Sequence, residues 1–242
     1  MIRNSLLGKV ATVIGLLTAV AGLAFASTHV DAGMTPDEAL QKMMDGNKRY
    51  VENQMTGSNM CGAATRTSLA KSQKPYAIVL TCSDSRVPPE IIFDKGLGEI
   101  FVIRVAGNVP DPIVLGSIEY AAEHLSSPLL MVLGHERCGA VSAAVGAKGK
   151  STGSANIDAI IKAISPNIKP AAKSCDACKG EAKCADTKKE AFIECVVDAN
   201  AKAVAAGITK KSKILKHLVE TKKLKVVAAK YDLDDGAVTV LK

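Results

Sequence analysis

The sequence has no tryptophan and few other aromatic residues: four Tyr and four Phe supply 3% of its 242 residues. A hydrophobic core must therefore be built from Ala, Val, Ile and Leu, which suits strands buried on both faces and helices of small residues that cover them. The chain also lacks a compact basic run interleaved with aromatics, which argues against a nucleic-acid-binding protein. The formal net charge of +7 is then explained by a solvated surface that aids solubility.

Widespread disorder is excluded by the balance of residue types. Apolar residues make up 48% of the chain and charged residues 23%, which are ordinary values for a globular protein. A chain of 242 residues allows one large domain or two small ones. The sequence shows no internal repeat and no clear second domain, so we expect a single domain over residues 27–242.

The first 26 residues have the pattern of a secretory signal peptide. Arg3 and Lys9 form a positive start, an uncharged apolar run follows, and residues 24–26 (AFA) offer a small-residue cleavage site. The apolar run is shorter than the ~20 residues of a spanning helix, so cleavage is favoured over a retained membrane anchor. We expect residues 1–26 to be removed and the rest to be exported, to the periplasm of a Gram-negative cell or to the extracellular space, with no membrane association after cleavage.

Short apolar runs alternate with helical segments after residue 75, which predicts an α/β fold with a mainly parallel β-sheet flanked by helices. The continuous apolar runs are typical of strands buried on both faces. Strands are expected at 76–81, 99–105 and 128–133, with a C-terminal strand pair at 224–231 and 237–241. Helices are expected at 111–125, 138–147, 191–206 and 212–221. The helix 138–147 is followed by a linker at 146–154.

An N-terminal helical arm is predicted to begin after Thr35. Thr35 can cap a helix that starts at Pro36, and Glu38 completes a capping box. This helix should run over 36–53, because its apolar positions share one face. Those positions are Ala39, Leu40, Met43, Met44 and Tyr50. A polar loop follows the helix.

Three residues with metal-binding side chains follow two of the predicted strands. Cys82 directly follows the strand 76–81, and His135 and Cys138 follow the strand 128–133. Open α/β sheets build their sites at the carboxyl ends of parallel strands. Two thiolates and one imidazole suit Zn2+ and leave the fourth position open, as in catalytic zinc sites. By itself H-x-x-C with one distant cysteine is a weak signal, since buried free cysteines and hydrogen-bonded histidines are common.

An acid–base pair next to Cys82 strengthens the prediction of a catalytic zinc site. Asp84 and Arg86 alternate with Cys82, so the three side chains can line one face of an extended segment. Arg86 can hold the Asp84 carboxylate ionised and fixed in direction, which leaves an oxygen free to accept a proton from a zinc-bound water. The alternative is a surface ion pair beside a structural site. Pro88 and Pro89 stiffen the chain directly after the pair and favour the catalytic interpretation.

The motifs CSDSRVPPE (82–90) and GHERCG (134–139) resemble those of the β-class carbonic anhydrases. The intervening FVIRVAGNV (101–109) and GSIEYAAEHL (116–125) also match the usual order of that family. The similarity extends from about residue 36 to the C-terminus, interrupted by a cysteine-rich segment. Two dispersed motifs in the right order make the resemblance specific.

The resemblance implies a zinc lyase that converts carbon dioxide to bicarbonate and a proton. Its zinc ligands would be Cys82, His135 and Cys138, with one Zn2+ per subunit. Asp84 and Arg86 would form the catalytic dyad that assists attack of zinc-bound hydroxide on carbon dioxide, and Asp84 would be a conditional fourth ligand. The family also implies a homodimer or a larger assembly of dimers.

Carbon dioxide is apolar, so its pocket should be small and apolar. We expect Val87, Gly107 and Gly139 to be candidates for the lining of this pocket. Two other functions stay open: a carbon disulfide hydrolase on the same scaffold, which would need a narrowed entrance, and a non-catalytic zinc or redox protein. The intact Asp84 and Arg86 argue against the non-catalytic protein, because a structural site has no need of them.

Five cysteines remain outside the predicted zinc site: Cys61, Cys175, Cys178, Cys184 and Cys195. The last four lie in or next to a Cys- and Lys-rich insertion (165–190) that departs from the family pattern. Disulfides are expected first in an oxidising compartment, a free or redox-active pair second and a zinc site third. A four-cysteine zinc site usually has two C-x-x-C pairs, and this segment has one. The odd count leaves at least one free or intermolecular thiol.

Overall fold

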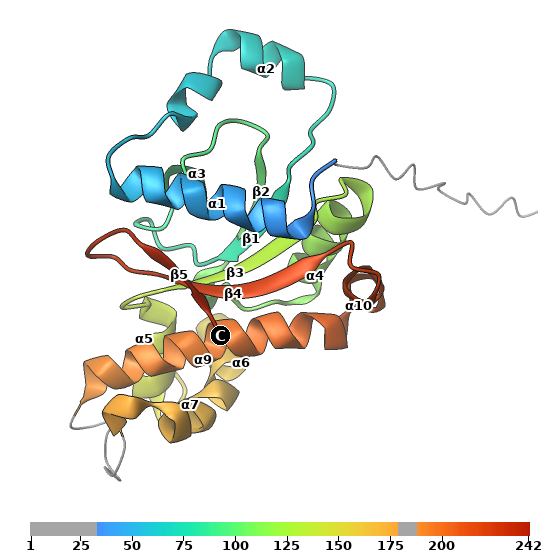
Figure 1. The fold of residues 1–242 in the computed structure, drawn as a ribbon. Coiled ribbons are helices and arrows are strands. Elements are labelled where there is room, and N and C mark those ends of the chain that lie inside the picture. The colour runs from blue at the N-terminus through green and yellow to red at the C-terminus, as the bar shows by residue number, and fades with distance from the viewer. Residues whose placement is uncertain (1–32, 179–187) are drawn as a thin grey trace, which may run out of the picture.

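The computed structural model describes residues 33–178 and 188–242. Their strands form one mixed sheet with the order β2-β1-β3-β4-β5. The strands are β1 (Ala77–Thr81), β2 (Ile100–Arg104), β3 (Leu129–His135), β4 (Lys225–Tyr231) and β5 (Val238–Leu241). All neighbouring pairs are parallel except β4 and β5. This mainly parallel sheet confirms the predicted fold class (Figure 1).

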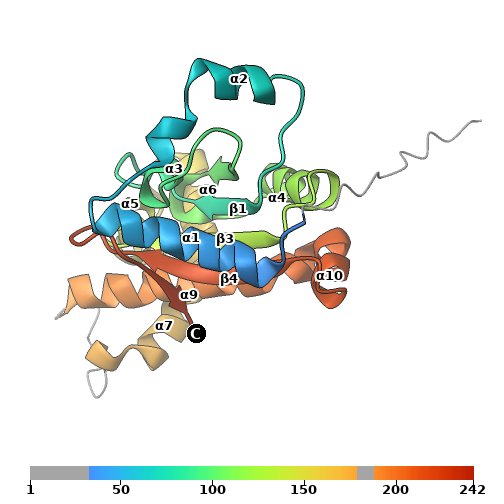
Figure 2. The same ribbon diagram turned by 45° about the horizontal axis from the view of Figure 1, so that its top comes forward.

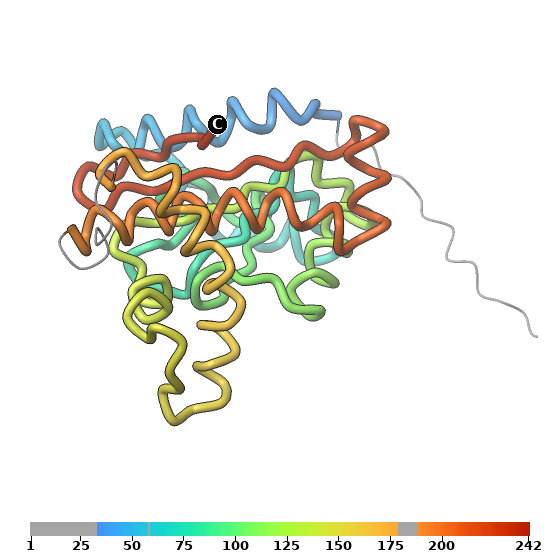
Figure 3. Tube along the Cα trace, turned by 90° about the horizontal axis from the view of Figure 1, so that it is seen from below, coloured from blue at the N-terminus to red at the C-terminus, as the bar shows by residue number. Residues whose placement is uncertain are grey.

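Helices cover both faces of the sheet, as two views 45° apart show (Figure 1 and Figure 2). One face carries α1 (Pro36–Val51). The other carries α4 (Pro112–Glu119), α9 (Lys189–Lys211) and α10 (Lys213–Glu220). Seen from below, α1 and α9 lie on opposite sides of β4 (Figure 3).

The two central strands, β1 and β3, are buried along their whole length. Alternate side chains of a strand point to opposite faces, so each strand contributes to two hydrophobic clusters. In β1, Val79 packs in the cluster under α1 and Leu80 in the cluster under α4, α9 and α10. Met131 and Val132 of β3 divide in the same way. Burial on both faces explains why these strands are continuous apolar runs.

The N-terminal helix α1 begins as predicted. The backbone N–H of Glu38 donates to Thr35 Oγ1 (3.3 Å), and the backbone N–H of Thr35 donates to Glu38 Oε2 (2.7 Å). This reciprocal pair is the predicted capping box. Ala39 and Met43 are fully buried against the sheet, so the apolar face holds the helix in place.

Several helices lie where the sequence predicted none. They are α2 (Ala63–Leu69), α3 (Pro89–Ile92), α6 (Ala155–Ile164) and α7 (Ile168–Ser174). The helix α2 buries none of its residues and α3 has only four residues, so neither shows an apolar periodicity. The start of α6 could have been predicted from Ser154, a residue type that often caps helices. In the structure, the N–H of Ile157 donates to Ser154 Oγ. Together with α5 (Gly139–Ala147), α6 projects from the body of the fold (Figure 3).

Other boundaries differ from the predicted ones for tertiary reasons. The helix α9 continues through Gly207, where the prediction ended it, because Val204 and Ile208 are buried on the sheet. The predicted helix 111–125 consists of α4 and a π-helical turn at Tyr120–His124. The strand β3 extends to His135 because β4 pairs with it as far as Tyr231.

Within the described ranges, no helix combines the length and the apolar character needed to cross a bilayer. The predicted signal peptide over residues 1–26 lies outside the described residues.

Candidate metal centre

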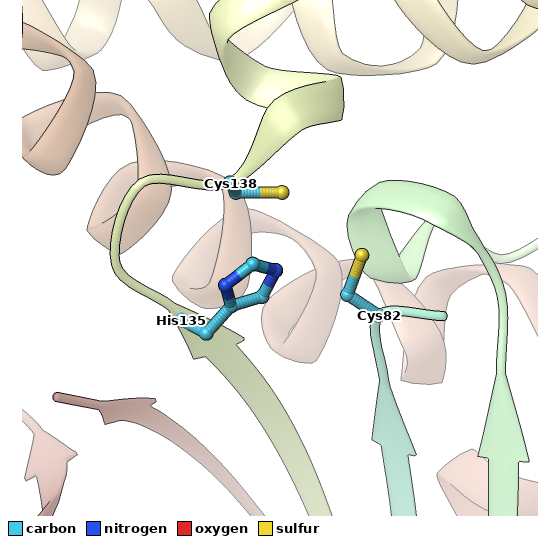
Figure 4. Close-up of side chains that lie close together, drawn as sticks. All are labelled: Cys82, His135 and Cys138. Carbon is cyan, nitrogen blue, oxygen red and sulfur yellow. The ribbon is translucent and has the colours of Figure 1, made fainter. Parts of the chain in front are cut away.

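The three predicted zinc ligands meet at the carboxyl edge of the sheet. Cys82 follows β1, His135 is the last residue of β3, and Cys138 caps α5. Their ligand atoms all lie within 4.8 Å of one another, and all three residues are buried. In the close-up, both sulfurs and the imidazole ring turn toward one common space (Figure 4).

The orientation of His135 fits a metal ligand. Its Nδ1 lies 2.8 Å from the carbonyl oxygen of Glu136. A proton on Nδ1 that is donated to this carbonyl leaves the lone pair on Nε2. Nε2 is buried and has no hydrogen-bond partner among the described residues. Since a buried polar atom without a partner is costly, this nitrogen is satisfied when it binds a metal ion.

The two thiols complete a donor set that suits Zn2+. The hydrogen bond from Cys138 lowers the pKa of the Cys82 thiol well below its ordinary value. The same hydrogen bond, together with burial, raises the pKa of Cys138. One thiolate therefore forms readily, and a divalent cation is what makes the second one favourable. Two sulfurs and one imidazole nitrogen with an open fourth position are the ligands of a catalytic zinc site.

Asp84 and Arg86 form the predicted pair at the edge of this ligand cluster. Arg86 Nε donates to Asp84 Oδ1 (2.9 Å), and Arg86 Nη2 donates to Asp84 Oδ2 (2.8 Å). These hydrogen bonds hold the pKa of the Asp84 carboxyl well below its usual range. Asp84 Oδ2 lies 3.9 Å from His135 Nε2. An ionised carboxylate of fixed direction thus faces the atom that would bind the metal.

Arg104 is a site residue that the sequence analysis missed. It ends β2 and pairs in register with Thr81 of the neighbouring strand. Its Nε donates to the carbonyl oxygen of Cys82 (3.1 Å), and its Nη2 donates to the carbonyl oxygen of Asp84 (2.5 Å). Arg104 therefore clamps the backbone that carries one ligand and the dyad carboxylate. The available signal was a charged residue at the end of an otherwise apolar strand.

The three candidate pocket residues lie in different environments. Gly107 contacts a ligand directly, because its N–H donates to Cys82 Sγ (3.4 Å). Val87 is fully buried in the hydrophobic cluster under α1. Gly139 is exposed at the first position of α5. The role of these residues in a carbon dioxide pocket stays a prediction.

Disulfide bonding dominates the cysteine-rich segment. Cys175 and Cys195 form a disulfide that joins the end of α7 to α9. Cys178 is also disulfide-bonded, and Cys184 lies outside the described residues. Cys61 is free and exposed. The structure thus pairs Cys175 with Cys195.

Comparison with known proteins connects strands β1 to β4 to one family. A family model described as "Carbonic anhydrase" matches residues 77–238. The carbonic anhydrase of Mycolicibacterium smegmatis is 45% identical over 134 residues, which are 55% of this chain and 65% of that protein. Carbonic anhydrase 2 of Mycobacterium tuberculosis is 48% identical over 117 residues, or 48% of this chain and 56% of that protein. The matched part thus spans less than two thirds of these relatives.

Solved structures share the fold at lower sequence identity. The β-carbonic anhydrase CcaA has a TM-score of 0.66 and 21% identity, covering 84% of this chain and 95% of that one. A tetrameric β-carbonic anhydrase from Sordaria macrospora has a TM-score of 0.62 and 22% identity, covering 72% and 84%. The family model accounts for more than half of the sequence, and the sheet and its helices follow the same architecture. This chain therefore belongs to the β-carbonic anhydrase family.

Proposed function

We propose that this chain catalyses the reversible hydration of carbon dioxide to bicarbonate and a proton. The observation that carries the proposal is the placement of Asp84. Its carboxylate receives two side-chain hydrogen bonds from Arg86, and its Oδ2 lies 3.9 Å from His135 Nε2. A purely structural metal site needs no ionised, oriented carboxylate beside its ligands.

Each residue of the site has a separate task in this reaction. Cys82, His135 and Cys138 would hold zinc, which supplies a Lewis acid that lowers the pKa of a bound water. Asp84 accepts a hydrogen bond from the reacting water and orients it toward carbon dioxide. Arg86 prevents the carboxylate from turning and keeps it ionised. Asp84 could bind zinc as a fourth ligand only if its carboxylate left Arg86. The paired hydrogen bonds therefore favour a role as hydrogen-bond acceptor for the water.

The proposal is tested by stopped-flow measurement of carbon dioxide hydration on protein whose zinc content is quantified. Activity should be lost on treatment with a chelator and restored by Zn2+. Zinc-loaded protein that is inactive under both reducing and oxidising conditions would overturn the proposal. Carbon disulfide hydrolysis by such protein would then identify the related hydrolase, and inactivity toward both substrates would identify a non-catalytic zinc protein.

A homodimer, or a larger assembly of dimers, is part of the proposal. Its support is an apolar surface at the β2 edge of the sheet. Ile113 of α4 is 80% exposed and Tyr120 is 48% exposed, and the Tyr120 ring lies 6.4 Å from the ring of Phe101 in β2. An unpaired edge strand beside exposed apolar side chains favours association with a second copy. Light scattering tests this, and a monomer at all concentrations would contradict it.

Export and removal of residues 1–26 complete the proposal. Two features support it: the signal pattern at the N-terminus and the disulfide between Cys175 and Cys195, since such bonds persist in oxidising compartments. N-terminal sequencing of the protein from the producing cells should begin near residue 27. Retention of Met1 in the bulk of the protein would contradict cleavage.

A further inference from the structure

We propose that α9 carries two positioning residues: Glu194, which holds the loop between His135 and Cys138, and Asn200, which holds the Gly107 turn whose N–H binds Cys82. The inference rests on the proposed zinc site and does not depend on the substrate. Neither residue touches a zinc ligand directly. Each acts through one intermediate residue, Arg137 or Gly107.

Glu194 supports the loop that joins His135 to Cys138. Its Oε1 accepts a hydrogen bond from the backbone N–H of Arg137 (2.8 Å). Arg137 has a φ of 50°, a left-handed conformation that a residue with a Cβ rarely adopts without support. The hydrogen bond to Glu194 supplies that support at the point where the chain turns between two ligands.

The same loop is held from its other side by Asp234. Arg137 Nη1 and Nη2 donate to the two carboxylate oxygens of Asp234, at 3.0 and 2.9 Å. The backbone of Arg137 is thus bound to α9, and its guanidinium is bound to the turn between β4 and β5. Of these two contacts, only the one from Glu194 is made to the peptide between the ligands.

Asn200 supports the other ligand, Cys82. The Asn200 side chain is buried, and its Nδ2 donates to the carbonyl oxygen of Gly107 (3.0 Å). Its Oδ1 accepts from Asn167 Nδ2 (3.0 Å), which fixes the direction of the amide. The N–H of Gly107 donates to Cys82 Sγ (3.4 Å). Asn200 therefore sets the peptide whose N–H binds a ligand sulfur, and such outer partners tune metal sites.

The position of α9 is itself tightly determined. A Cβ added to Gly134 would meet Val197 Cγ1 at 3.1 Å and Ala201 Cβ at 3.4 Å, so the helix packs closely on the residue before His135. The disulfide from Cys195 to Cys175 ties the turn next to Glu194 to α7. At 100° per residue, Glu194, Val197, Asn200 and Ala201 fall on one side of the helix. One face of α9 thus contacts both the loop between His135 and Cys138 and the Gly107 turn.

The experiment compares four variants of the full chain loaded with Zn2+ or with Co2+. Glu194→Ala and Asn200→Ala remove the two supports, Glu194→Gln keeps an oxygen acceptor, and Glu190→Ala changes an exposed residue one turn earlier on α9. We measure the rate at which a chelator removes Zn2+. Loss should be about 10- to 100-fold faster in the two positioning variants. Glu194→Gln and Glu190→Ala should lose Zn2+ at nearly the same rate as the parent protein.

The Co2+ absorption spectrum separates positioning from simple destabilisation. Asn200→Ala should shift the sulfur-to-cobalt charge-transfer band, because the N–H bond to Cys82 Sγ changes. Val204→Ala, a buried change on the same helix, should lower the thermal midpoint and leave the band in place. If Asn200→Ala does not fold, Asn167→Ala serves instead, since it removes only the partner that orients Asn200. The same shift in the band is expected.

The inference would be overturned if Glu194→Ala and Asn200→Ala lost Zn2+ to the chelator at the same rate as the parent protein. An unshifted cobalt band in Asn200→Ala, or in Asn167→Ala where it replaces that variant, would do the same. A parent protein that binds Zn2+ without hydrating carbon dioxide refutes only the proposed reaction, and the variant comparison still decides the inference. A parent protein that binds no Zn2+ refutes both.

Discussion

Replacement of Asp94 by Ala tests how strongly the loop after α3 holds the end of α1 and the segment that follows it. Asp94 is 1% exposed and joins three residues that precede it by about 40 positions. Its carboxylate accepts hydrogen bonds from Arg49 Nε, from the backbone N–H and hydroxyl of Thr56 (2.8 and 3.2 Å), and from the backbone N–H of Gly57. Ala would leave these donors without an acceptor.

The expected loss of unfolding free energy follows from these contacts. Breaking a buried ion pair by removing one partner costs about 3–5 kcal/mol. The Arg49 side chain is 34% exposed and can regain water, so the lower end of about 3 kcal/mol applies to this site. Asp94 also has a φ of 49°, where Ala costs roughly 1 kcal/mol more. We expect a total loss of about 4 kcal/mol, a large part of the stability of a typical domain.

Urea unfolding of Asp94→Ala measures this loss, and Asp158→Ala is the matched control. Asp158 also accepts hydrogen bonds from two neighbouring loop residues, Ser151 and Thr152, at a solvent-exposed site. Its replacement should cost much less, because water can take over the exposed donors. Equal losses in the two variants would refute the reasoning that burial sets the magnitude.

The effect of Asp94 should also depend on pH. Burial raises the pKa of Asp94, but the hydrogen bonds from Arg49, Gly57 and Thr56 outweigh it, and the pKa in the folded protein lies below the ordinary value. A carboxyl with a lowered folded pKa stabilises the protein above its unfolded pKa of about 3.9. That stabilisation is lost as the pH falls through the folded pKa. The stability difference between the parent and Asp94→Ala should therefore shrink below about pH 4, and a constant difference would contradict the assigned charge.

Four further predictions concern the site, the disulfide and the surface. Asp84→Asn should keep zinc but lower the carbon dioxide hydration rate by about 10²- to 10⁴-fold; full activity in stopped-flow would contradict its role. Cys138→Ser should lose both zinc and stability, because metal binding is coupled to folding, and stoichiometric zinc by atomic absorption would refute the ligand assignment. Replacing Cys175 and Cys195 together by Ala should lower the unfolding free energy by about 3 kcal/mol, since their disulfide spans 20 residues; unchanged urea unfolding would refute this. Ile113→Glu should yield monomers in light scattering, because it places a charge on the exposed apolar surface, and an unchanged mass would exclude that surface as the interface.

The fold class and the zinc ligands could be predicted because short stretches of the sequence carry the patterns that indicate them. The capping box at Thr35 acts over three residues, and continuous apolar runs mark strands buried on both faces. The ligands Cys82 and His135 could be assigned to one edge because parallel strands end at the same edge of a sheet. Of the four helices that were not predicted, α2 buries none of its residues and α3 has only four, so neither shows an apolar face in the sequence. The far end of α9 was missed because its burial on the sheet outweighs the low helix propensity of Gly207.

The sequence by itself determined the zinc-ligand types, the Asp84–Arg86 pair and the mainly parallel sheet, because the motifs and apolar runs that predict them are each contained in a short segment. Only the tertiary structure decided what supports them. Arg104 reaches Cys82 across 22 residues, Glu194 reaches Arg137 across 57, and Asn200 reaches Gly107 across 93. A hydrogen bond between side chain and backbone leaves no pattern in the sequence when its partners are brought together by packing. The residues that carry the chemistry of this site therefore lie in short sequence motifs, and the fold sets their geometry.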